Sequence, residues 1–295
     1  MKIFMTQPRY SKVTSWEKNK VIRVITNLKN NSEQTRIELT ENSKEADIIV
    51  MLESCMVKTP KYKKMLLEED VVKLRPFRVY TINYEDKPLG LLPGIYSSLE
   101  LDQFNKKNHL SWPHLDFPNN YVDIYAGNNM LEQNSFLFTF SGSCSHPLRN
   151  ILFSAYPEES NLYKIVEVKK WYDHSEDEKD NYVKDILSCK YVLCPRGIAS
   201  YSHRIIETIA LGRVPVIIAD NWVPFSIPET GYYLKINEND IFAIPEILKK
   251  WEPWYEEMVK NVKTVYRKYF DQGKRYSIAI LKIIELHSRI NSNNI

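Results

Sequence analysis

The residues best suited to chemistry form the run LCPRGIASYSHRIIE, which spans positions 193 to 207. Its apolar start predicts a buried strand that stops at Pro195 and opens into a short loop containing Gly197. Ser200 or Ser202 can then cap the helix that follows. In parallel α/β sheets, ligands bind where such a strand ends and the next helix begins. The N–H groups and the dipole at that helix start favour an anion such as a diphosphate.

Two side chains in the first turns of this helix suit a nucleotide. Arg204 offers a planar fork for phosphate oxygens. Glu207 lies three residues further on, on the same face, where its carboxylate can accept hydrogen bonds from ribose hydroxyls. An ordinary strand, loop and helix with a surface Arg–Glu pair is an equally good interpretation of this segment alone, because such pairs are common and weak.

The elements that must position these residues alternate between apolar runs and helix-like stretches. This alternation is typical of βαβ units and a parallel sheet. The expected strands are 3–6, 46–52, 77–82, 136–140, 162–168, 191–194 and 214–219. The expected helices are 16–27, 62–73, 177–187 and 203–211, followed by a largely helical stretch over 241–287. Residues 87–120, rich in proline and aromatics, are expected to form irregular connections with short elements.

Composition limits the class of protein. The chain has 295 residues, enough for two domains, and 40 basic against 37 acidic side chains give a net charge of +3. That balance disfavours a nucleic-acid partner. No run approaches the ~20 apolar residues of a membrane helix, and the first residues lack a signal peptide's apolar core. The four cysteines, Cys55 among them, show no CxxC spacing, so we expect buried free thiols in a cytoplasmic protein.

Residues 193 to 225 resemble the signature of the exostosin family of glycosyltransferases. The matching pattern is a strand, Pro-Arg-Gly, a variable loop, Arg-x-x-Glu, Gly-x-Val-Pro-Val-Ile and Pro-Phe. The upstream run FTFSG at 138–142, followed by Pro147 and Arg149, resembles the element that opens the family's nucleotide-binding half. The strong resemblance covers residues 135–250 and is weak before 130. It implies a GT-B fold, in which two Rossmann-like domains with parallel sheets face each other across a cleft.

The resemblance also implies roles at single positions. Arg204 would bind the donor diphosphate and Glu207 the ribose, Gly142 would let backbone approach the ligand, and the remaining donor-binding candidates are Arg149, Arg196, Gly197, Ser200 and His203. For His203, packing of its helix is an equally good interpretation. Family members commonly invert the anomeric centre, and the eukaryotic ones usually carry an N-terminal anchor. The sequence shows no such anchor, which favours a bacterial or viral enzyme with different acceptors.

We expect neither a metal nor another cofactor. No Asp-x-Asp follows an apolar strand, and the acidic run 176–178 suits a helix start, where carboxylates complement the dipole. The leaving diphosphate would then be stabilised by arginines and helix N–H groups. A base for the acceptor hydroxyl should come from the first domain. Glu53, directly after a buried strand, is the first candidate; Asp86 and His114 compete, and Asp116 is weaker. A solvated loop residue is the alternative for each.

The expected function is transfer of a sugar from a UDP- or GDP-sugar to a glycan acceptor in surface polysaccharide synthesis. Trp112, Trp222 and Tyr96 could line an acceptor groove. A non-catalytic glycan- or nucleotide-binding protein is one alternative, and an epimerase or NAD-dependent oxidoreductase is disfavoured by the missing G-x-G-x-x-G.

The sequence also predicts how the chain divides into domains. The expected domains are 1–130 for the acceptor, 131–270 for the nucleotide sugar, and a helix at 271–295 that could pack on the first domain.

Overall fold

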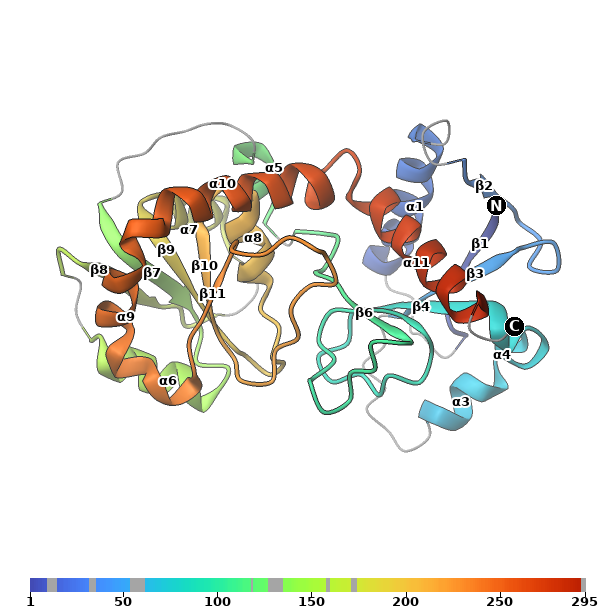
Figure 1. Ribbon diagram of the computed structural model, residues 1–295, viewed down its shortest axis with the longest axis horizontal. Helices are drawn as coiled ribbons and strands as arrows, with labels where there is room; N and C mark the ends of the chain where they lie inside the picture. The colour runs from blue at the N-terminus through green and yellow to red at the C-terminus, as the bar shows by residue number, and fades with distance from the viewer. Residues whose placement is uncertain are drawn as a thin grey trace. The chain divides into compact units, whose positions relative to one another are not determined.

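The computed structural model describes residues 1–9, 15–31, 36–53, 62–117, 119–126, 135–157, 160–170 and 174–292. The chain divides into two compact units. Unit 1 consists of Met1–Asp116, Val223–Ser226 and Gly273–Ile295, and unit 2 of Phe117–Trp222 and Ile227–Gln272. The chain therefore crosses between the units more than once, and its C-terminal helix belongs to the unit that contains the N-terminus (Figure 1).

Unit 1 is built on a six-stranded parallel sheet in the order β2-β1-β3-β4-β5-β6. Its strands are β1 (Lys2–Thr6), β2 (Glu38–Leu39), β3 (Ile48–Glu53), β4 (Val79–Asn83), β5 (Gly94–Tyr96) and β6 (His109–Ser111). Its helices are α1 (Ser15–Asn30), α3 (Tyr62–Glu68), α4 (Asp70–Leu74), the short 3₁₀ helix η1 (Pro76–Arg78) and α11 (Arg275–Ser292). Every residue of β3 is buried, as expected for a central strand covered on both faces.

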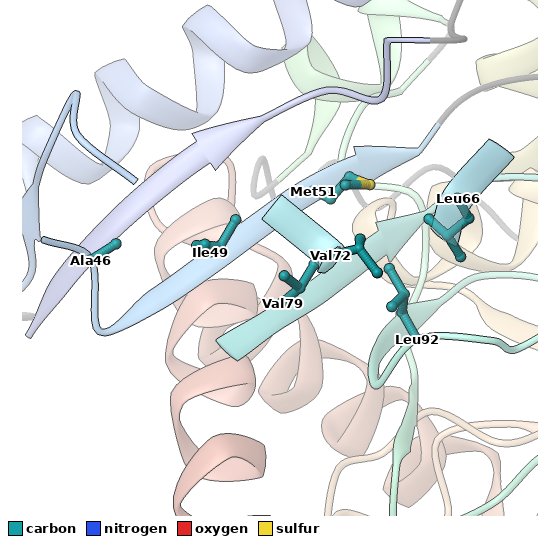
Figure 2. Packing of buried hydrophobic residues seen from close by; sticks show 7 residues of the cluster. All are labelled: Ala46, Ile49, Met51, Leu66, Val72, Val79 and Leu92. Carbon is teal, nitrogen blue, oxygen red and sulfur yellow. The ribbon is translucent and has the colours of Figure 1, made fainter. Parts of the chain in front are cut away.

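The core of unit 1 includes a cluster of seven buried apolar side chains on one side of β3 and β4 (Figure 2). Ile49 and Met51 alternate along β3, and Val79 follows on β4. Leu66 of α3 and Val72 of α4 pack onto them, which seats both short helices on the sheet. This burial of apolar surface is the main force that holds the strand ends of unit 1 in place.

Helix α11 lies beside α1 within unit 1 (Figure 1). Asn27 of α1 accepts hydrogen bonds from the N–H and the hydroxyl of Ser277. Asp116 accepts a hydrogen bond from the Tyr276 hydroxyl and forms an ion pair with Arg23, 3.2 Å away. Asp116 is therefore a buried structural carboxylate that ties both helices to the end of the first segment of unit 1.

Unit 2 has a five-stranded parallel sheet in the order β11-β10-β9-β7-β8. Its strands are β7 (Phe136–Gly142), β8 (Tyr163–Glu167), β9 (Cys189–Pro195), β10 (Val214–Ile218) and β11 (Leu234–Lys235). Its helices are α5 (Asn120–Tyr125), α6 (Pro147–Ala155), α7 (Glu176–Leu187), α8 (His203–Ala210), α9 (Ile244–Trp251) and α10 (Tyr255–Val265). The turns η2 (Glu238–Ala243), η3 (Glu252–Trp254) and η4 (Tyr266–Phe270) complete it.

Local sequence signals explain where the helices of unit 2 begin. Helix α7 starts with a full capping box, in which Ser175 and Glu178 bond each other's backbone N–H groups. Its first turn contains the acidic run 176–178, as predicted. Helix α6 starts with Pro147, and the ring of His146 accepts from the N–H of Leu148. The predicted class, two Rossmann-like α/β units that each contain a parallel sheet, is confirmed.

The structure also shows elements that the sequence did not reveal. Strands β5 and β6 lie in the stretch 87–120, which was expected to be irregular apart from short elements. Helices α5 and α6 were not predicted. The single helix expected over 62–73 is two short helices separated at Glu69. The structure is described by its division into units 1 and 2. The domain boundaries expected at residues 130 and 270 stay predictions.

Candidate functional site

The site in unit 2 is formed where two neighbouring strands end. Strands β7 and β9 pair in parallel, so Gly142 and Pro195 close the same edge of the sheet. Helix α6 follows β7 and carries Arg149, and helix α8 follows β9 and carries Arg204. The two guanidinium groups therefore lie close together at the carboxyl edge of the sheet, which is where parallel α/β sheets bind ligands.

Arg204 is held against the end of β7. Its Nη2 donates a hydrogen bond to the carbonyl oxygen of Ser141. Its guanidinium carbon lies 4.6 Å from the centre of the Phe140 ring and 5.6 Å from that of the Tyr182 ring. The side chain is 8% exposed, and its buried Nε has no hydrogen-bond partner among the described residues. Arg204 is thus fixed in orientation without having all its donors satisfied.

Arg149 is fixed by three backbone carbonyl groups. Its Nε donates to Arg196, its Nη1 to Ser143 and its Nη2 to Pro195, at 3.0, 3.1 and 3.2 Å. These contacts join the loops that follow β7 and β9. Burial, and then the charge of Arg204, lower the pKa of Arg149 to about 10, so the group is still a cation at neutral pH.

The electrostatic balance of this pair is incomplete. In the described part of the chain, neither Arg149 nor Arg204 forms an ion pair with a carboxylate. Glu207 interacts electrostatically with Arg204 but lies beyond ion-pair distance. Charged groups that are buried in proteins are ordinarily paired or bound to a ligand. Two adjacent buried cations at one strand edge therefore offer charge and hydrogen-bond donors that suit an anion.

Arg196 differs from the other two arginines because it has an acidic neighbour. Its Nη1 lies 3.6 Å from Oε1 of Glu238, and its N–H donates to Ile218. Glu238 and Asp220 accept hydrogen bonds from each other's backbone N–H, at 3.0 and 3.1 Å. This reciprocal pair fixes the segment after β10 and holds Arg196 beside the site, with its charge already partly compensated.

Glu207 is buried on the face of α8 that looks toward α7. The hydroxyl of Tyr182 donates to its Oε2 at 2.6 Å. Burial raises the pKa of Glu207, while the hydrogen bond from Tyr182 and the charge of Arg204 act in the opposite direction. The carboxylate is therefore held in one orientation beside the arginine pair.

The remaining predicted donor-binding residues lie along the same two loops. Gly142 and Gly197 give room to the arginines: a Cβ on Gly142 would lie 3.0 Å from Nη2 of Arg204, and one on Gly197 would lie 3.2 Å from Nη2 of Arg149. Ser200 is buried in the loop before α8. The N-cap of α8 is Ser202, whose side chain makes no capping bond to the described helix. The His203 ring packs edge-to-face against Tyr201.

Two contributors to the site were missed by sequence reasoning. Phe140 was assigned only to a strand, yet both Arg149 and Arg204 lie over its ring, at 5.5 and 4.6 Å. Tyr182 was assigned only to a helix, and nothing in that pattern distinguishes it from a packing residue. Both roles depend on contacts between elements that are distant in the sequence, and period and spacing carry no signal for such contacts.

The candidate bases follow the strands of unit 1. Glu53 ends β3, as predicted, is 2% exposed, and accepts hydrogen bonds from the Tyr62 hydroxyl at 2.9 Å and from Nδ2 of Asn83 at 2.5 Å. Asp86 is exposed after β4. His114 follows β6, and its ring lies 4.8 Å from that of Tyr84 in the loop after β4. The loops after β4 and β6 therefore meet above the sheet edge that Glu53 closes.

Some expectations about side-chain exposure were wrong. Tyr96, Trp112 and Trp222 are at most 2% exposed, so they do not present ring faces to a glycan. Cys144 is exposed, whereas Cys189 and Cys194 are buried as expected; Cys55 lies outside the described residues.

The described residues form neither a metal-ion cluster nor a helix able to span a membrane. No cluster of three His, Cys, Asp or Glu side chains there could hold a metal ion. No helix formed by the described residues is long and apolar enough to cross a membrane.

Comparison with known proteins shows the family to which this chain belongs. A model of the Exostosin GT47 domain matches residues 95–251, more than half of the chain. The chain belongs to the Exostosin GT47 family. The matched region begins within β5 of unit 1 and includes all of the arginine site in unit 2.

Curated relatives align over shorter stretches. An Exostosin-1 homolog of Caenorhabditis elegans is 31% identical over 116 residues, which is 38% of this chain and 30% of the relative. The probable beta-1,4-xylosyltransferase IRX10 of Arabidopsis thaliana is 36% identical over 80 residues, which is 26% of this chain and 19% of the relative. The chain thus matches less than a third of the length of either relative.

Solved structures align with nearly the whole chain at low identity. An α1,3-fucosyltransferase with GDP-fucose has a TM-score of 0.46 and 14% identity, covering 97% of this chain and 90% of the other. Anabaena Alr3699/HepE in complex with UDP has a TM-score of 0.48 and 10% identity, covering 97% of this chain and all of the other.

Proposed function

We propose that the arginine site of unit 2 binds the diphosphate of a nucleotide sugar and that the protein is a glycosyltransferase. The observation that carries this proposal is the pair of buried guanidinium groups, Arg149 and Arg204, which have no ionic partner among the described residues. A diphosphate supplies the missing negative charge and accepts several hydrogen bonds from such donors. Membership of the Exostosin GT47 family, with relatives named as xylosyl- and glucuronosyltransferases, supports the same class of donor.

The arrangement of side chains suits a displacement at the anomeric carbon. The acceptor oxygen forms a bond to that carbon, and the bond from the carbon to the diphosphate oxygen breaks. Negative charge then builds up on the departing diphosphate, where Arg204, Arg149 and the first N–H groups of α8 would stabilise it. Because these groups are already fixed by Ser141 and by three backbone carbonyls, little reorganisation is needed during the reaction.

The family resemblance implies the finer features of the proposed reaction. The donor is a UDP- or GDP-sugar, the acceptor is a glycan hydroxyl, and the configuration at the anomeric carbon is inverted. Inversion in one step needs a base that removes the acceptor proton. We assign that role first to Glu53 and then to Asp86 or His114. Charge stabilisation by the arginines would make a divalent cation unnecessary.

A ligand screen followed by a transfer assay tests the proposal. A bound donor stabilises the folded protein by mass action, so one member of a panel of UDP- and GDP-sugars should raise the Tm. With that donor, the protein should transfer or slowly hydrolyse the sugar, and EDTA should leave most of the activity. Binding without any turnover would indicate a nucleotide-binding protein, and complete loss in EDTA restored by Mn²⁺ would overturn the metal-free mechanism.

A further inference from the structure

Tyr182 touches both functional side chains of helix α8 although it comes from a different helix. It lies near the middle of α7, and its hydroxyl donates to Oε2 of Glu207 at 2.6 Å. The face of its ring lies 5.6 Å from the guanidinium carbon of Arg204. One residue therefore contacts the group assigned to the ribose and the group assigned to the diphosphate.

The hydrogen bond to Glu207 leaves one carboxylate oxygen for a ligand. Oε2 is occupied by Tyr182, whereas Oε1 has no hydrogen-bond partner among the described residues. A glutamate side chain has three rotatable bonds, and fixing it costs conformational entropy on binding. A carboxylate already fixed through one oxygen can accept ligand hydroxyls through the other without that cost.

The ring of Tyr182 acts on Arg204 together with Phe140. The guanidinium lies over both rings, at 4.6 Å from Phe140 and 5.6 Å from Tyr182. Contacts between a guanidinium and an aromatic face are attractive and become stronger when the pair is desolvated. Only one nitrogen of Arg204 donates to a described residue, Ser141, so the two rings supply the rest of its orientation.

We propose that Tyr182 is a positioning residue of the donor site, which orients the Glu207 carboxylate through its hydroxyl and supports the Arg204 guanidinium through its ring. This inference rests on the proposed function of the site. It predicts an effect that passes through Glu207. If Tyr182 only packed α7 against α8, its removal would lower stability without a specific effect on the nucleotide.

The first test is Tyr182→Phe, which keeps the ring and removes the hydroxyl. Calorimetric titration with UDP and GDP should show a Kd about tenfold higher than that of the wild type, the effect of roughly 1.4 kcal/mol. Since the ribose does not react, the KM for the donor should rise while kcat changes little. Tyr182→Leu should weaken binding further, because it also removes the ring beside Arg204.

The matched control is Tyr125→Phe. The Tyr125 hydroxyl donates at 2.9 Å to Asp180, a carboxylate on the same helix α7. This variant also removes a bond from a tyrosine to a carboxylate, yet it lies outside the donor site. It should leave both Kd and KM within twofold of the wild type, whatever its effect on Tm.

A double-mutant cycle with Glu207→Ala separates positioning from packing. In the Glu207→Ala background, adding Tyr182→Phe should change Kd by less than twofold, because the side-chain acceptor that Tyr182 orients is gone. A further tenfold loss there, or a Tyr182→Phe variant that binds like the wild type while Arg204→Ala does not bind, overturns the role of Tyr182 and leaves the proposed function intact. If the wild type binds neither UDP nor GDP, the proposed function fails, and the Tyr182 proposal fails with it.

Discussion

The guanidinium carbons of Arg149 and Arg204 lie 5.5 and 4.6 Å from the centre of one ring, that of Phe140. Two like charges approach each other only at a cost, and after burial the charge of Arg204 is the second cause that lowers the pKa of Arg149. The aromatic ring offsets part of it, since its faces attract cations. An anion that contacts both guanidiniums would offset the remaining repulsion between them.

Replacing Arg204 by alanine should reduce sugar transfer by at least ~10²-fold. In the proposed reaction the arginine contacts the diphosphate most fully as negative charge develops on it, and removal of one such electrostatic contact typically has an effect of this size. Arg204→Lys keeps the charge but loses the planar fork, so its activity should lie between those of the alanine variant and the wild type. Initial rates at saturating donor measure both effects.

Arg213→Ala provides the matched control for that experiment. Arg213 is as buried as Arg204, and its Nη2 donates to the Leu187 carbonyl at 2.7 Å, away from the end of β7. Its removal should lower the Tm and leave the nucleotide Kd unchanged. An Arg204→Ala variant with near-wild-type transfer would exclude this side chain from the mechanism.

Gly142→Ala should weaken nucleotide binding about tenfold. The new Cβ would lie 3.0 Å from Nη2 of Arg204 and 3.0 Å from the tip of the Phe140 ring. The Arg204 guanidinium must then shift by a few tenths of an ångström, and displacing a charge-assisted donor from its ligand corresponds to roughly a tenfold change in affinity. Calorimetry with UDP or GDP measures it.

Gly212→Ala separates backbone strain from displacement of the arginine. Gly212 has a φ of +69°, and its Cβ would meet only Lys263, at 3.6 Å. An alanine there should destabilise the fold by about 1 kcal/mol without changing nucleotide affinity. Equal Kd values for the Gly142→Ala variant and the wild type would show that the position of Arg204 tolerates the extra carbon.

The predicted and observed structures agree where the sequence signal is local. The strand at β9, the helix at α8 and the loop between them follow from an apolar run, a Pro-Arg-Gly turn and a helical period, and Arg204 and Glu207 could be selected from that pattern. The place of Glu53 at the end of β3 is also local information. Such signals depend only on neighbours in the chain.

What the sequence did not reveal depends on contacts between distant segments. Strand β5 has three residues and begins at Gly94, whose φ of +147° lets the backbone approach Thr81 of β4. No apolar period marks so short a strand. In the same way, the bond from Tyr182 to Glu207 and the shared ring of Phe140 appear only when α7, α8 and β7 are brought together.

Acidification should destabilise the protein through His109. This ring is buried in β6, where Nδ1 accepts the N–H of Asn105 at 3.0 Å and Nε2 lies 3.1 Å from the Gly90 carbonyl. Those partners require the neutral tautomer with its proton on Nε2, and burial lowers the pKa of His109 below its usual 6.5. As the pH falls, His109 of the unfolded chain therefore binds a proton before His109 of the folded protein does. The contribution of His109 to the free energy of unfolding is constant above pH 6.5 and falls as the pH drops below it.

Urea unfolding between pH 7.5 and 5 measures this loss. His109→Gln should flatten the pH dependence of the midpoint, even if it lowers the midpoint at every pH. Burial also lowers the pKa of His287, which is bonded to the Tyr80 hydroxyl, so part of the slope should remain until that residue is replaced as well. An unchanged slope in the double variant would assign the acid sensitivity to other groups.

Substitution of the three candidate bases should separate catalysis from structure in unit 1. Removing the residue that takes the acceptor proton should lower kcat by about 10²–10⁴-fold and leave the nucleotide Kd unchanged, because the base does not contact the diphosphate. Glu53→Gln is the first variant to measure. Two donors, Tyr62 and Asn83, already bind the Glu53 carboxylate and hold it in one orientation.

Those two bonds also make Glu53 a structural link from β3 to helix α3 and to β4, so its substitution should lower the Tm. Asp86 is exposed, so Asp86→Asn should leave the Tm unchanged. His114→Gln removes the ring contact with Tyr84 and is the third variant. A large loss of kcat with an unchanged Kd in one variant alone identifies the base. If Glu53→Gln loses stability but retains kcat, Glu53 is a structural residue, and the proton acceptor is Asp86 or His114.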